Sequence, residues 1–290
     1  MTIKEVLRIA YSKYKLSPLD AEILLSLAAG KSKEFILAHP EKELNSLKLK
    51  KFILFAKRRC NGEPVAHITG KKEFFGLEFR VNKNVLIPRP ETELLAEYTI
   101  QKLKNTNCKI PDAVIDAGTG SGNIIIPIAK SLPGKINKKI KFYAVDISKE
   151  SLKIAKTNAK NHGVDKKIKF IQSDLLEYFL KNKPKYKNIL VLANLPYVSP
   201  KIYSKNINYL KCEPKQALYS LEKGLAHYKK LIKQVGLLIT DRWSLIFEIS
   251  PEQKPEISRI FKECLPNGNA KFIKDLAGKW RMAVILSKRR

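Results

Sequence analysis

The sequence has no long apolar run and no leading apolar segment, and both shortages exclude classes of protein. Among its 290 residues, no uncharged apolar stretch approaches the roughly 18 residues that a bilayer-spanning helix needs. The start of the chain has Lys4, Glu5 and Arg8 where a secretory signal peptide would have its apolar core. We therefore expect a cytoplasmic protein with no membrane contact.

The cysteines are too few and too far apart for a disulfide framework or a metal site. Cys60, Cys108, Cys212 and Cys264 lie about fifty residues or more apart, without a C-x-x-C pair or a histidine at metal-ligand spacing. We expect buried thiols and no bound metal. The histidines also lack partners at the spacing of a ligand set or a triad, so helix ends and loops are expected for His39, His67, His162 and His227.

Arginine is scarce although the chain is strongly basic. The net charge is +29, from 56 Lys and Arg against 27 Asp and Glu, and arginine accounts for only 10 of the 56. A basic surface suits an anionic partner such as ribosomal RNA. Arginine recognises nucleic acid better than lysine does, and the lysines are spread along the chain. A selected basic surface and a general compositional bias toward lysine both stay open.

The composition and the residue patterns predict a globular protein with a helical beginning. An apolar fraction of 44% and a charged fraction of 29% are near globular averages. Ser17-Pro18 forms the expected cap and first turn of a helix that Gly30 ends, and residues 46–60 predict another helix. Aromatic and β-branched residues around Gly76 then predict a β-hairpin linker that includes residues 85–87.

Beyond this linker, short apolar runs alternate with helical segments. Strands are expected at residues 113–117, 142–145, 168–171, 189–193 and 245–249, with helices at 124–130, 149–161 and 221–235. This alternation predicts an α/β fold with a parallel, doubly wound, Rossmann-like sheet. Two final runs, 271–273 and 282–286, predict an antiparallel edge.

A glycine-rich turn follows the first of these strands and predicts an adenosyl ligand. Gly118, Gly120 and Gly122 have G-x-G-x-G spacing, and Asn123 stands where the dinucleotide fingerprint requires its last glycine. The pattern therefore favours S-adenosylmethionine, with an NAD site or a purely structural turn as alternatives. Asp116 is expected to steady the loop through hydrogen bonds.

Acidic residues also end the next two expected strands. Asp146 lies where its carboxylate can accept both ribose hydroxyls, and Asp174 and Leu175 lie where a side chain can meet the adenine ring. Ligands of open α/β sheets bind at these carboxyl ends of the strands. The three signals together predict one cofactor site.

Asn194-Leu195-Pro196-Tyr197 follows the strand expected at 189–193 and resembles the (D/N/S)-P-P-Y motif of methyltransferases that act on planar, conjugated nitrogens. The lone pair of such a nitrogen is delocalised, so the site must orient it and hold its hydrogens. The Asn194 side-chain carbonyl and a backbone carbonyl can accept the two N–H bonds, and an aromatic ring can pack on the planar group. No general base is required.

Two segments resemble linker signatures of the HemK/PrmC protein-(glutamine-N5) methyltransferases: residues 59–70, RCNGEPVAHITG, and residues 87–93, IPRPETE. Similar matches at 213–214, 217–218 and 275–278 extend the resemblance over the chain. It implies a class I S-adenosylmethionine-dependent methyltransferase with a small all-α substrate-recognition domain (1–72), a β-hairpin linker (73–90) and a methyltransferase domain (91–290).

The resemblance further implies methyl transfer to N5 of the glutamine in the Gly-Gly-Gln motif of class I peptide chain release factors, which modulates translation termination. S-adenosyl-L-homocysteine is then the product, and we expect a monomer. Cofactor roles carry over onto Gly118, Thr119, Gly120, Ser121, Gly122, Asp146 and Asn194, with Asp174 and Leu175 at the adenine. Catalysis and glutamine binding carry over onto Asn194, Leu195, Pro196 and Tyr197.

Leu195 departs from this family's usual first proline, so the turn lacks one locked φ angle. The Asn-Leu-Pro-Tyr form is also typical of rRNA adenine-N6 dimethyltransferases, although those enzymes have their helical domain after the catalytic core. Adenine methylation therefore stays an alternative, as does a non-catalytic module that binds S-adenosylmethionine or RNA.

Arg89, Glu91 and Glu93 either position cofactor or substrate at the mouth of the site or cap a helix that begins near Thr92.

Overall fold

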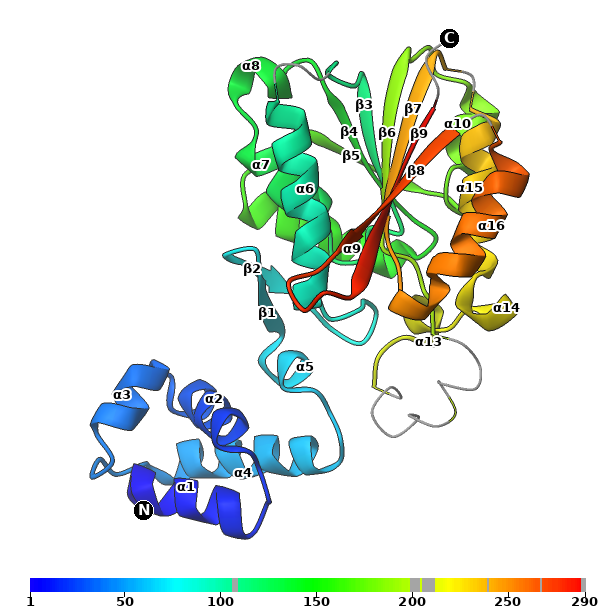
Figure 1. The fold of residues 1–290 in the computed structure, drawn as a ribbon. Coiled ribbons are helices and arrows are strands. Elements are labelled where there is room, and N and C mark those ends of the chain that lie inside the picture. The colour runs from blue at the N-terminus through cyan, green and yellow to red at the C-terminus, as the bar shows by residue number, and fades with distance from the viewer. Residues whose placement is uncertain (106–108, 199–203, 205–211, 239, 267, 288–290) are drawn as a thin grey trace. The chain divides into compact units, whose positions relative to one another are not determined.

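The computed structural model describes residues 1–105, 109–198, 204, 212–238, 240–266 and 268–287. Within it the chain divides into two compact units, Met1–Lys71 and Lys72–Arg290. Figure 1 shows the smaller unit as helices alone and the larger unit as a twisted sheet with helices on both faces. No helix in the described part of the chain is long and apolar enough to cross a bilayer.

The smaller unit is a helical bundle, as predicted. Its helices are α1 (Ile3–Ser12), α2 (Pro18–Ala29), α3 (Lys33–Ala38), α4 (Ser46–Cys60) and α5 (Val65–Thr69). The Ser17 hydroxyl accepts the Asp20 amide at the start of α2, and Gly30 ends this helix in the left-handed conformation. Leu24 and Leu25 of α2 and Phe52 of α4 are fully buried in the core of this unit.

The larger unit contains a seven-stranded sheet in the order β5-β4-β3-β6-β7-β9-β8. Its strands are β3 (Ala113–Ala117), β4 (Lys141–Asp146), β5 (Ile168–Gln172), β6 (Asn188–Ala193), β7 (Arg242–Glu248), β8 (Gly268–Lys274) and β9 (Trp280–Ser287). The strands from β3 to β7 pair in parallel, whereas β9 runs antiparallel to both β7 and β8. The predicted Rossmann-like sheet with an antiparallel edge is confirmed.

Helices cover both faces of this sheet (Figure 1). One face packs against α6 (Glu93–Lys104), α7 (Ile125–Ser131) and α9 (Lys149–Asn161), and the other against α10 (Glu177–Asn182), α15 (Ala226–Gly236) and α16 (Lys254–Cys264). The remaining short elements are α8 (Gly134–Asn137), α13 (Lys215–Leu218), α14 (Leu221–Gly224), η1 (Pro90–Thr92) and η2 (Pro251–Gln253). Because both faces are covered, β3 is buried along its whole length.

A two-stranded hairpin, β1 (Lys71–Phe74) and β2 (Leu77–Arg80), precedes the sheet. Phe74 and Phe79 are buried in the same core cluster as α6 and α7, so the hairpin packs on the larger unit. Residues 85–87, which we expected to be β-rich, form no strand. Pro88 and Pro90 remove two backbone donors directly after this segment and disfavour continued strand pairing.

The single helix expected over residues 221–235 is wrong. The structure breaks it into α14 and α15, with left-handed φ angles of +50° at Glu222 and +58° at Lys223. A Cβ at Gly224 would lie 2.1 Å from the Tyr197 carbonyl oxygen, so this contact requires glycine. The break therefore brings the backbone of residue 224 against the turn that follows β6.

The expectation of buried cysteines is also wrong where the structure tests it. Cys60 is exposed, Cys212 and Cys264 are partly exposed, and Cys108 lies outside the described residues. Cys60 ends α4 on the surface, where its thiol donates to the Tyr14 carbonyl.

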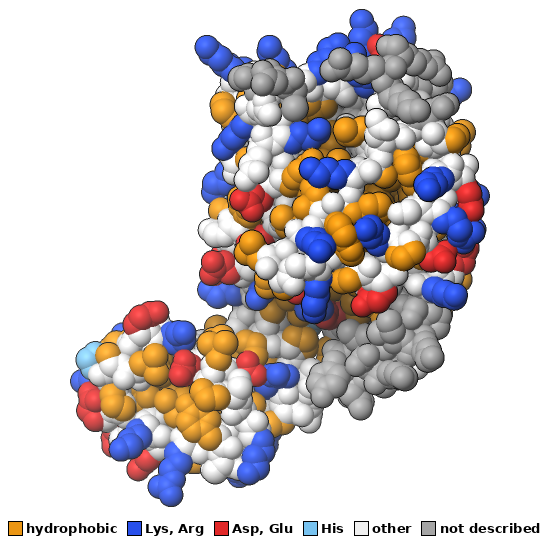
Figure 2. Space-filling model, in the orientation of Figure 1, with side chains coloured by type: hydrophobic (Ala, Val, Ile, Leu, Met, Phe, Trp, Pro, Cys, Tyr) orange, Lys and Arg blue, Asp and Glu red, His pale blue; other side chains and the backbone are white. Residues whose placement is uncertain are grey.

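On the face shown in Figure 2, Lys and Arg side chains of the larger unit are scattered among apolar and polar ones.

Candidate active site

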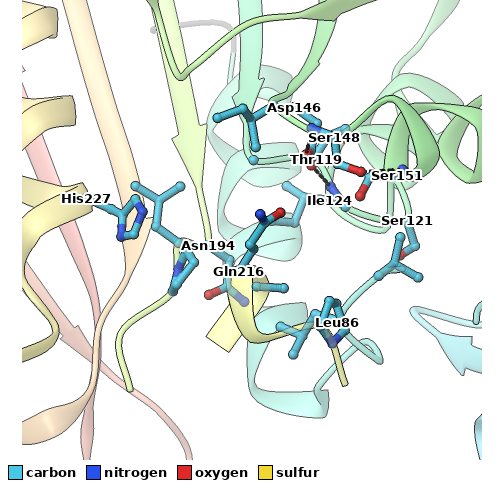
Figure 3. Close-up of a pocket in the computed structure, with 18 of the residues that line it drawn as sticks. Leu86, Thr119, Ser121, Ile124, Asp146, Ser148, Ser151, Asn194, Gln216 and His227 are labelled. Atoms are coloured by element: carbon cyan, nitrogen blue, oxygen red, sulfur yellow. Dashed lines mark hydrogen bonds between the residues drawn. The ribbon is translucent and has the colours of Figure 1, made fainter. Parts of the chain in front are cut away.

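A cavity of about 510 Å³ lies at the carboxyl ends of the parallel strands. Its lining comes from the segments that follow β3, β4, β5 and β6, from the linker before α6, and from α13 and α15. Figure 3 shows Thr119, Asp146 and Ser148 grouped together, with Asn194 and His227 toward the other side. The volume and the position are those of a small-molecule site in an open α/β sheet.

The glycine turn after β3 is fixed mainly by backbone hydrogen bonds. The Gly118 and Thr119 amides donate to the Val145 carbonyl at 2.8 and 2.9 Å. The φ angle of Gly118 is +77°, and a Cβ there would lie 3.0 Å from Cδ2 of Leu195. Backbone of the turn therefore approaches both the cavity and the Asn194–Tyr197 segment closely, as only glycine allows.

Asp146 connects this turn to the end of β4. Its Oδ2 accepts the Gly120 amide and its Oδ1 accepts the Ser148 amide, both at 2.9 Å. Burial raises the pKa of the Asp146 carboxyl, and these backbone donors oppose that rise. Each carboxylate oxygen keeps a lone pair that can accept a ligand hydroxyl.

Asp116 lies beneath the turn and is completely buried. The Thr119 hydroxyl donates to its Oδ2 at 2.7 Å, while its Oδ1 has no hydrogen-bond partner within the described residues. Burial raises the pKa of the Asp116 carboxyl to about 7, and the nearby Asp146 charge adds to this rise. Its hydrogen bond to Thr119 agrees with the expected loop-steadying role.

The hairpin supports the glycine turn through Asn158 of α9. The buried Asn158 amide donates to the Ser121 carbonyl at 2.9 Å and to the Arg80 carbonyl at 3.1 Å, and its Oδ1 accepts the Arg80 amide at 2.8 Å. Nearby, the Ser151 hydroxyl donates to the Asn84 carbonyl at 3.0 Å. These bonds attach the hairpin and the linker to α9 and, through Asn158, to the glycine turn.

Asp174 and Leu175, the residues that we expected at the adenine, follow β5 and line the cavity. Lys230 of α15 donates to Asp174 Oδ2 at 2.6 Å and to Glu177 at 2.7 Å, so its ammonium group holds one oxygen of the predicted carboxylate. Leu175 has a φ angle of +52° and is buried. Sequence reasoning missed Lys230, because its partner is 56 residues away.

The turn after β6 brings Asn194, Leu195 and Pro196 to the cavity wall, whereas Tyr197 is not among the residues that line it. The Asn194 Nδ2 donates to the Thr92 hydroxyl at 2.9 Å. Leu195 is buried, and its carbonyl accepts the Tyr228 hydroxyl at 3.2 Å. The Tyr197 hydroxyl instead bonds to Glu248, and burial raises the pKa of Tyr197 to about 12.

Thr92 and Glu248 form a buried pair behind Asn194 that sequence reasoning missed. The Thr92 hydroxyl donates to Glu248 Oε2 at 2.6 Å, and the two residues are only 1% and 2% exposed. Burial raises the pKa of the Glu248 carboxyl to about 7, although Thr92, Arg281 and Tyr197 stabilise its charge. An acidic residue at the end of an expected strand was the available signal.

Arg89, Glu91 and Glu93, which we expected either to position a ligand or to cap a helix, have different partners in the structure. Arg89 lines the cavity and forms an ion pair with the buried Glu213, which also accepts the Ile87 amide at 3.0 Å. Glu93 begins α6 but accepts the Phe75 amide at 2.8 Å, so it holds the hairpin turn. Glu91 is exposed in η1, without a side-chain capping bond.

All four histidines lie at or near helix ends, as expected, and His227, in the first turn of α15, also lines the cavity. His39 and His162 follow α3 and α9, and His67 is in the last turn of α5. His227 lines the cavity, and its Nδ1 contacts the Ser220 hydroxyl at 3.0 Å. Burial lowers the pKa of His227, which favours the neutral ring.

Comparisons with known proteins match both parts of the chain. Residues 111–265 match a family described as "Methyltransferase domain", and residues 6–70 match the PrmC N-terminal domain. The release factor glutamine methyltransferase of Clostridium botulinum is 33% identical over 97% of this chain and 98% of its own length. The chain belongs to the release factor glutamine methyltransferase family.

Further matches include a second release factor glutamine methyltransferase, a longer bifunctional protein and a solved structure with the same fold. The corresponding protein of Bacillus subtilis is 32% identical over 90% of this chain and 88% of its own length. A bifunctional methyltransferase of Rickettsia bellii is 35% identical over 84% of this chain, which spans only 46% of that protein. The hMettl16 catalytic domain has a TM-score of 0.57 at 14% identity, covering 78% of this chain and 82% of its own, which supports the fold alone.

Proposed function

We propose that this protein transfers the methyl group of S-adenosylmethionine to the side-chain amide nitrogen of the glutamine in the Gly-Gly-Gln motif of class I release factors. The orientation of the Asn194 amide is the observation that supports this most strongly. Its Nδ2 is committed to Thr92, and its Oδ1 accepts no hydrogen bond within the described residues. A free carbonyl oxygen at the cavity wall suits an incoming N–H donor.

The cavity fits the cofactor by chemistry and by size. Its volume of about 510 Å³ lies within the range of cofactor pockets. We assign the ribose to Asp146, whose oxygens keep free lone pairs, and the adenine to the cavity wall formed by Asp174 and Leu175. The Gly118 to Gly122 turn offers close backbone approach, and Asn194 completes the assigned set. When bound, S-adenosylmethionine supplies an electrophilic methyl group on its sulfonium.

The residues after β6 then orient the acceptor. In this proposal, Asn194 Oδ1 and the Leu195 carbonyl accept the two amide hydrogens, so the nitrogen lone pair points at the methyl group. The Leu195 carbonyl has a lone pair besides the one facing Tyr228. Positioning supplies the rate enhancement. The N–CH₃ bond forms as the S–CH₃ bond of the sulfonium breaks, and the methylated amide then loses one N–H proton to water, so no general base is required. Pro196 stiffens the turn, and Tyr197 stays assigned to the glutamine from the motif alone.

The helical unit is the part we assign to recognition of the substrate protein. It matches the PrmC N-terminal domain over residues 6–70. Among the described residues of this unit, Leu19, Leu37, Leu47 and Leu54 are each more than half exposed. Exposed leucines of this kind suit a protein partner better than a nucleic acid.

Transfer of labelled methyl from S-adenosylmethionine tests the function. The acceptors are a class I release factor, its Gly-Gly-Gln glutamine-to-alanine variant, and stripped ribosomal subunits, each with the full-length protein. We expect label on the unmodified factor alone. Label on ribosomal RNA would support adenine methylation instead, and cofactor binding without transfer to any acceptor would support a non-catalytic module.

A further inference from the structure

Glu248 ends β7 and is the shared end of two hydrogen-bond chains that reach the proposed acceptor oxygens. Its carboxylate accepts the Thr92 hydroxyl, and Thr92 accepts Nδ2 of Asn194. Its main-chain carbonyl accepts the Tyr228 hydroxyl at 2.7 Å, and the same hydroxyl contacts the Leu195 carbonyl at 3.2 Å. Both oxygens that we assign to the amide hydrogens are therefore held from one residue.

The first chain determines which way the Asn194 amide faces. A threonine hydroxyl has one proton, and here that proton is donated to Glu248 Oε2 at 2.6 Å. Thr92 can then only accept from Asn194, so it selects the nitrogen end of the amide. The oxygen end is left for the cavity, where an acceptor is needed. A flipped amide would present N–H donors to the reacting NH₂ group of the substrate, which itself offers N–H donors.

The second chain holds the backbone of the turn. Tyr228 is completely buried, and burial raises the pKa of its hydroxyl well above the ordinary value. It therefore stays protonated, and its single proton is shared between the Glu248 carbonyl at 2.7 Å and, as the longer branch, the Leu195 carbonyl at 3.2 Å. Leu195 lacks the locked φ angle of a proline, and this contact supplies a side-chain restraint in the same turn.

We propose that Glu248, acting through Thr92 and Tyr228, is the positioning residue that holds Asn194 Oδ1 and the Leu195 carbonyl toward the amide nitrogen of the substrate. This inference rests on the proposed function, because it concerns the same acceptor site. It adds three residues, one from β7, one from η1 and one from α15, to the set assigned by the Asn-Leu-Pro-Tyr motif.

The direction of these hydrogen bonds depends on whether the Glu248 carboxyl is protonated. Arg281 of β9 favours the ionised carboxylate and Glu91 of η1 opposes it, while the hydroxyls of Thr92, Tyr197 and Tyr228 stay neutral over the range considered. Burial raises the pKa of Glu248 to about 7. Below that pH the carboxyl is protonated and can donate to Thr92, which frees the threonine proton for Asn194 Oδ1. The amide can then flip, and activity should fall as the pH falls.

Three threonine variants of the full-length protein test the first chain. Thr92→Val removes the hydroxyl at constant shape, Thr92→Ser restores it, and Thr99→Val is the matched control. Thr99 is buried in α6, and its hydroxyl has no hydrogen-bond partner within the described residues. We expect Thr92→Val to lower kcat about tenfold with little change in KM for the release factor, as the loss of one orienting hydrogen bond predicts. Thr92→Ser should recover most of kcat, and Thr99→Val should match the wild type.

The pH profile separates positioning from a merely structural role. Wild-type kcat should fall below about pH 7 on one protonation, and this limb should be absent from Glu248→Gln and Thr92→Val. Melting temperatures and binding of S-adenosylhomocysteine establish that each variant is folded. Unchanged kcat in folded Thr92→Val, or an unchanged acidic limb in folded Glu248→Gln, would overturn the inference.

A readout without the substrate protein separates this inference from the proposed function. The side-chain NH₂ resonances of Asn194, assigned with Asn194→Ala, should titrate with the Glu248 carboxyl in the wild type and stop titrating in Thr92→Val. If they titrate so while the release factor is not methylated, the positioning chain stands and the proposed substrate is wrong. If they do not respond to Glu248, the positioning chain is wrong whatever the substrate.

Discussion

The two sides of the cavity rest on the same kind of buried pair, built in different ways. On the side that we assign to the cofactor, here called the cofactor side, Thr119 donates to Asp116, three residues before it in the chain. On the side that we assign to the substrate, here called the acceptor side, Thr92 donates to Glu248, and 156 residues separate the two. Both carboxyls have a pKa raised to about 7 by burial. The Asp116–Thr119 pair is therefore local in sequence, whereas the Thr92–Glu248 pair forms only in the completed fold.

The two sides also differ in the atoms that hold them. Backbone amides of Gly118, Thr119 and Gly120 hold the glycine turn, the first two on the Val145 carbonyl and the third on the Asp146 carboxylate. Side chains of Asn194, Thr92 and Tyr228 fix the acceptor turn. Substitutions should consequently affect the two sides through different measurable quantities, binding on one and turnover on the other.

The largest effect is expected from Asp116→Asn on the pH dependence of stability. The folded pKa of about 7 lies above the ordinary 3.8, so the native state keeps a proton that the unfolded chain releases. The free energy of unfolding therefore falls as pH rises from about 4 to about 7, by up to about 4 kcal/mol for this group. Asp116→Asn should remove that contribution in urea unfolding at several pH values. Glu248→Gln should remove a separate part of the pH dependence of the free energy of unfolding. If neither variant changes this pH dependence, the two buried pairs are not alike.

Asn194→Ala should be the most damaging change for turnover. It deletes the oxygen that we assign to an amide hydrogen, and loss of such a preorganised partner lowers kcat roughly 100-fold. Single-turnover methyl transfer measures this directly. Full turnover with alanine at 194 would remove the acceptor side from the mechanism.

Asp146→Ala should act on binding instead. It removes a carboxylate that holds the Gly120 and Ser148 amides and, in our assignment, the ribose. We expect the Kd of S-adenosylmethionine to rise about thirtyfold, as loss of charge-assisted hydrogen bonds predicts. Calorimetry checks this, and Asp112→Ala is a control at the opposite end of the sheet, where Asp112 holds backbone amides of 187 and 188. Equal losses of affinity in both variants would contradict a local role.

The smallest effect concerns the contact between the two sides. Gly118→Ala combines a left-handed φ with the close approach to Leu195, whereas Gly163→Ala has a φ of +69° and open space around the new Cβ. The control should cost about 1 kcal/mol of stability from φ alone. Gly118→Ala should cost roughly 1 kcal/mol more, since crowding adds to it. Leu195→Ala in the same chain should abolish that excess in urea unfolding.

Local patterns made much of the larger unit predictable. The alternation of apolar runs and helices, the glycine turn and Asp146 all lie within short stretches, so spacing alone indicated the sheet and the cofactor side. The helix expected over 221–235 failed because the break at Gly224 depends on contact with Tyr197, which is distant in sequence. The helix α16 had no predicted counterpart.

The partners of the acceptor side could not be inferred from spacing. Nothing near Thr92 indicates Glu248, because η1 must first pack against the end of β7 to bring the two residues together. The strand expected at 245–249 did contain Glu248, an acidic residue at a strand's carboxyl end like Asp146. Applying the same argument to both strands would have found the carboxylate, though not its connection through Thr92.

Leu195 is a position where the two sides meet directly. Its side chain is buried and lies against the backbone of Gly118, so it fixes the spacing between the turn assigned to the methyl donor and the turn assigned to the acceptor. A proline ring folds back onto its own backbone nitrogen and would not reach across this gap in the same way. In-line transfer depends on separations of about 3 to 3.5 Å between reacting atoms. A proline would restrain only the backbone of its own turn, whereas Leu195 restrains its turn against the glycine turn. The position of the acceptor is thereby coupled to the position of the methyl donor.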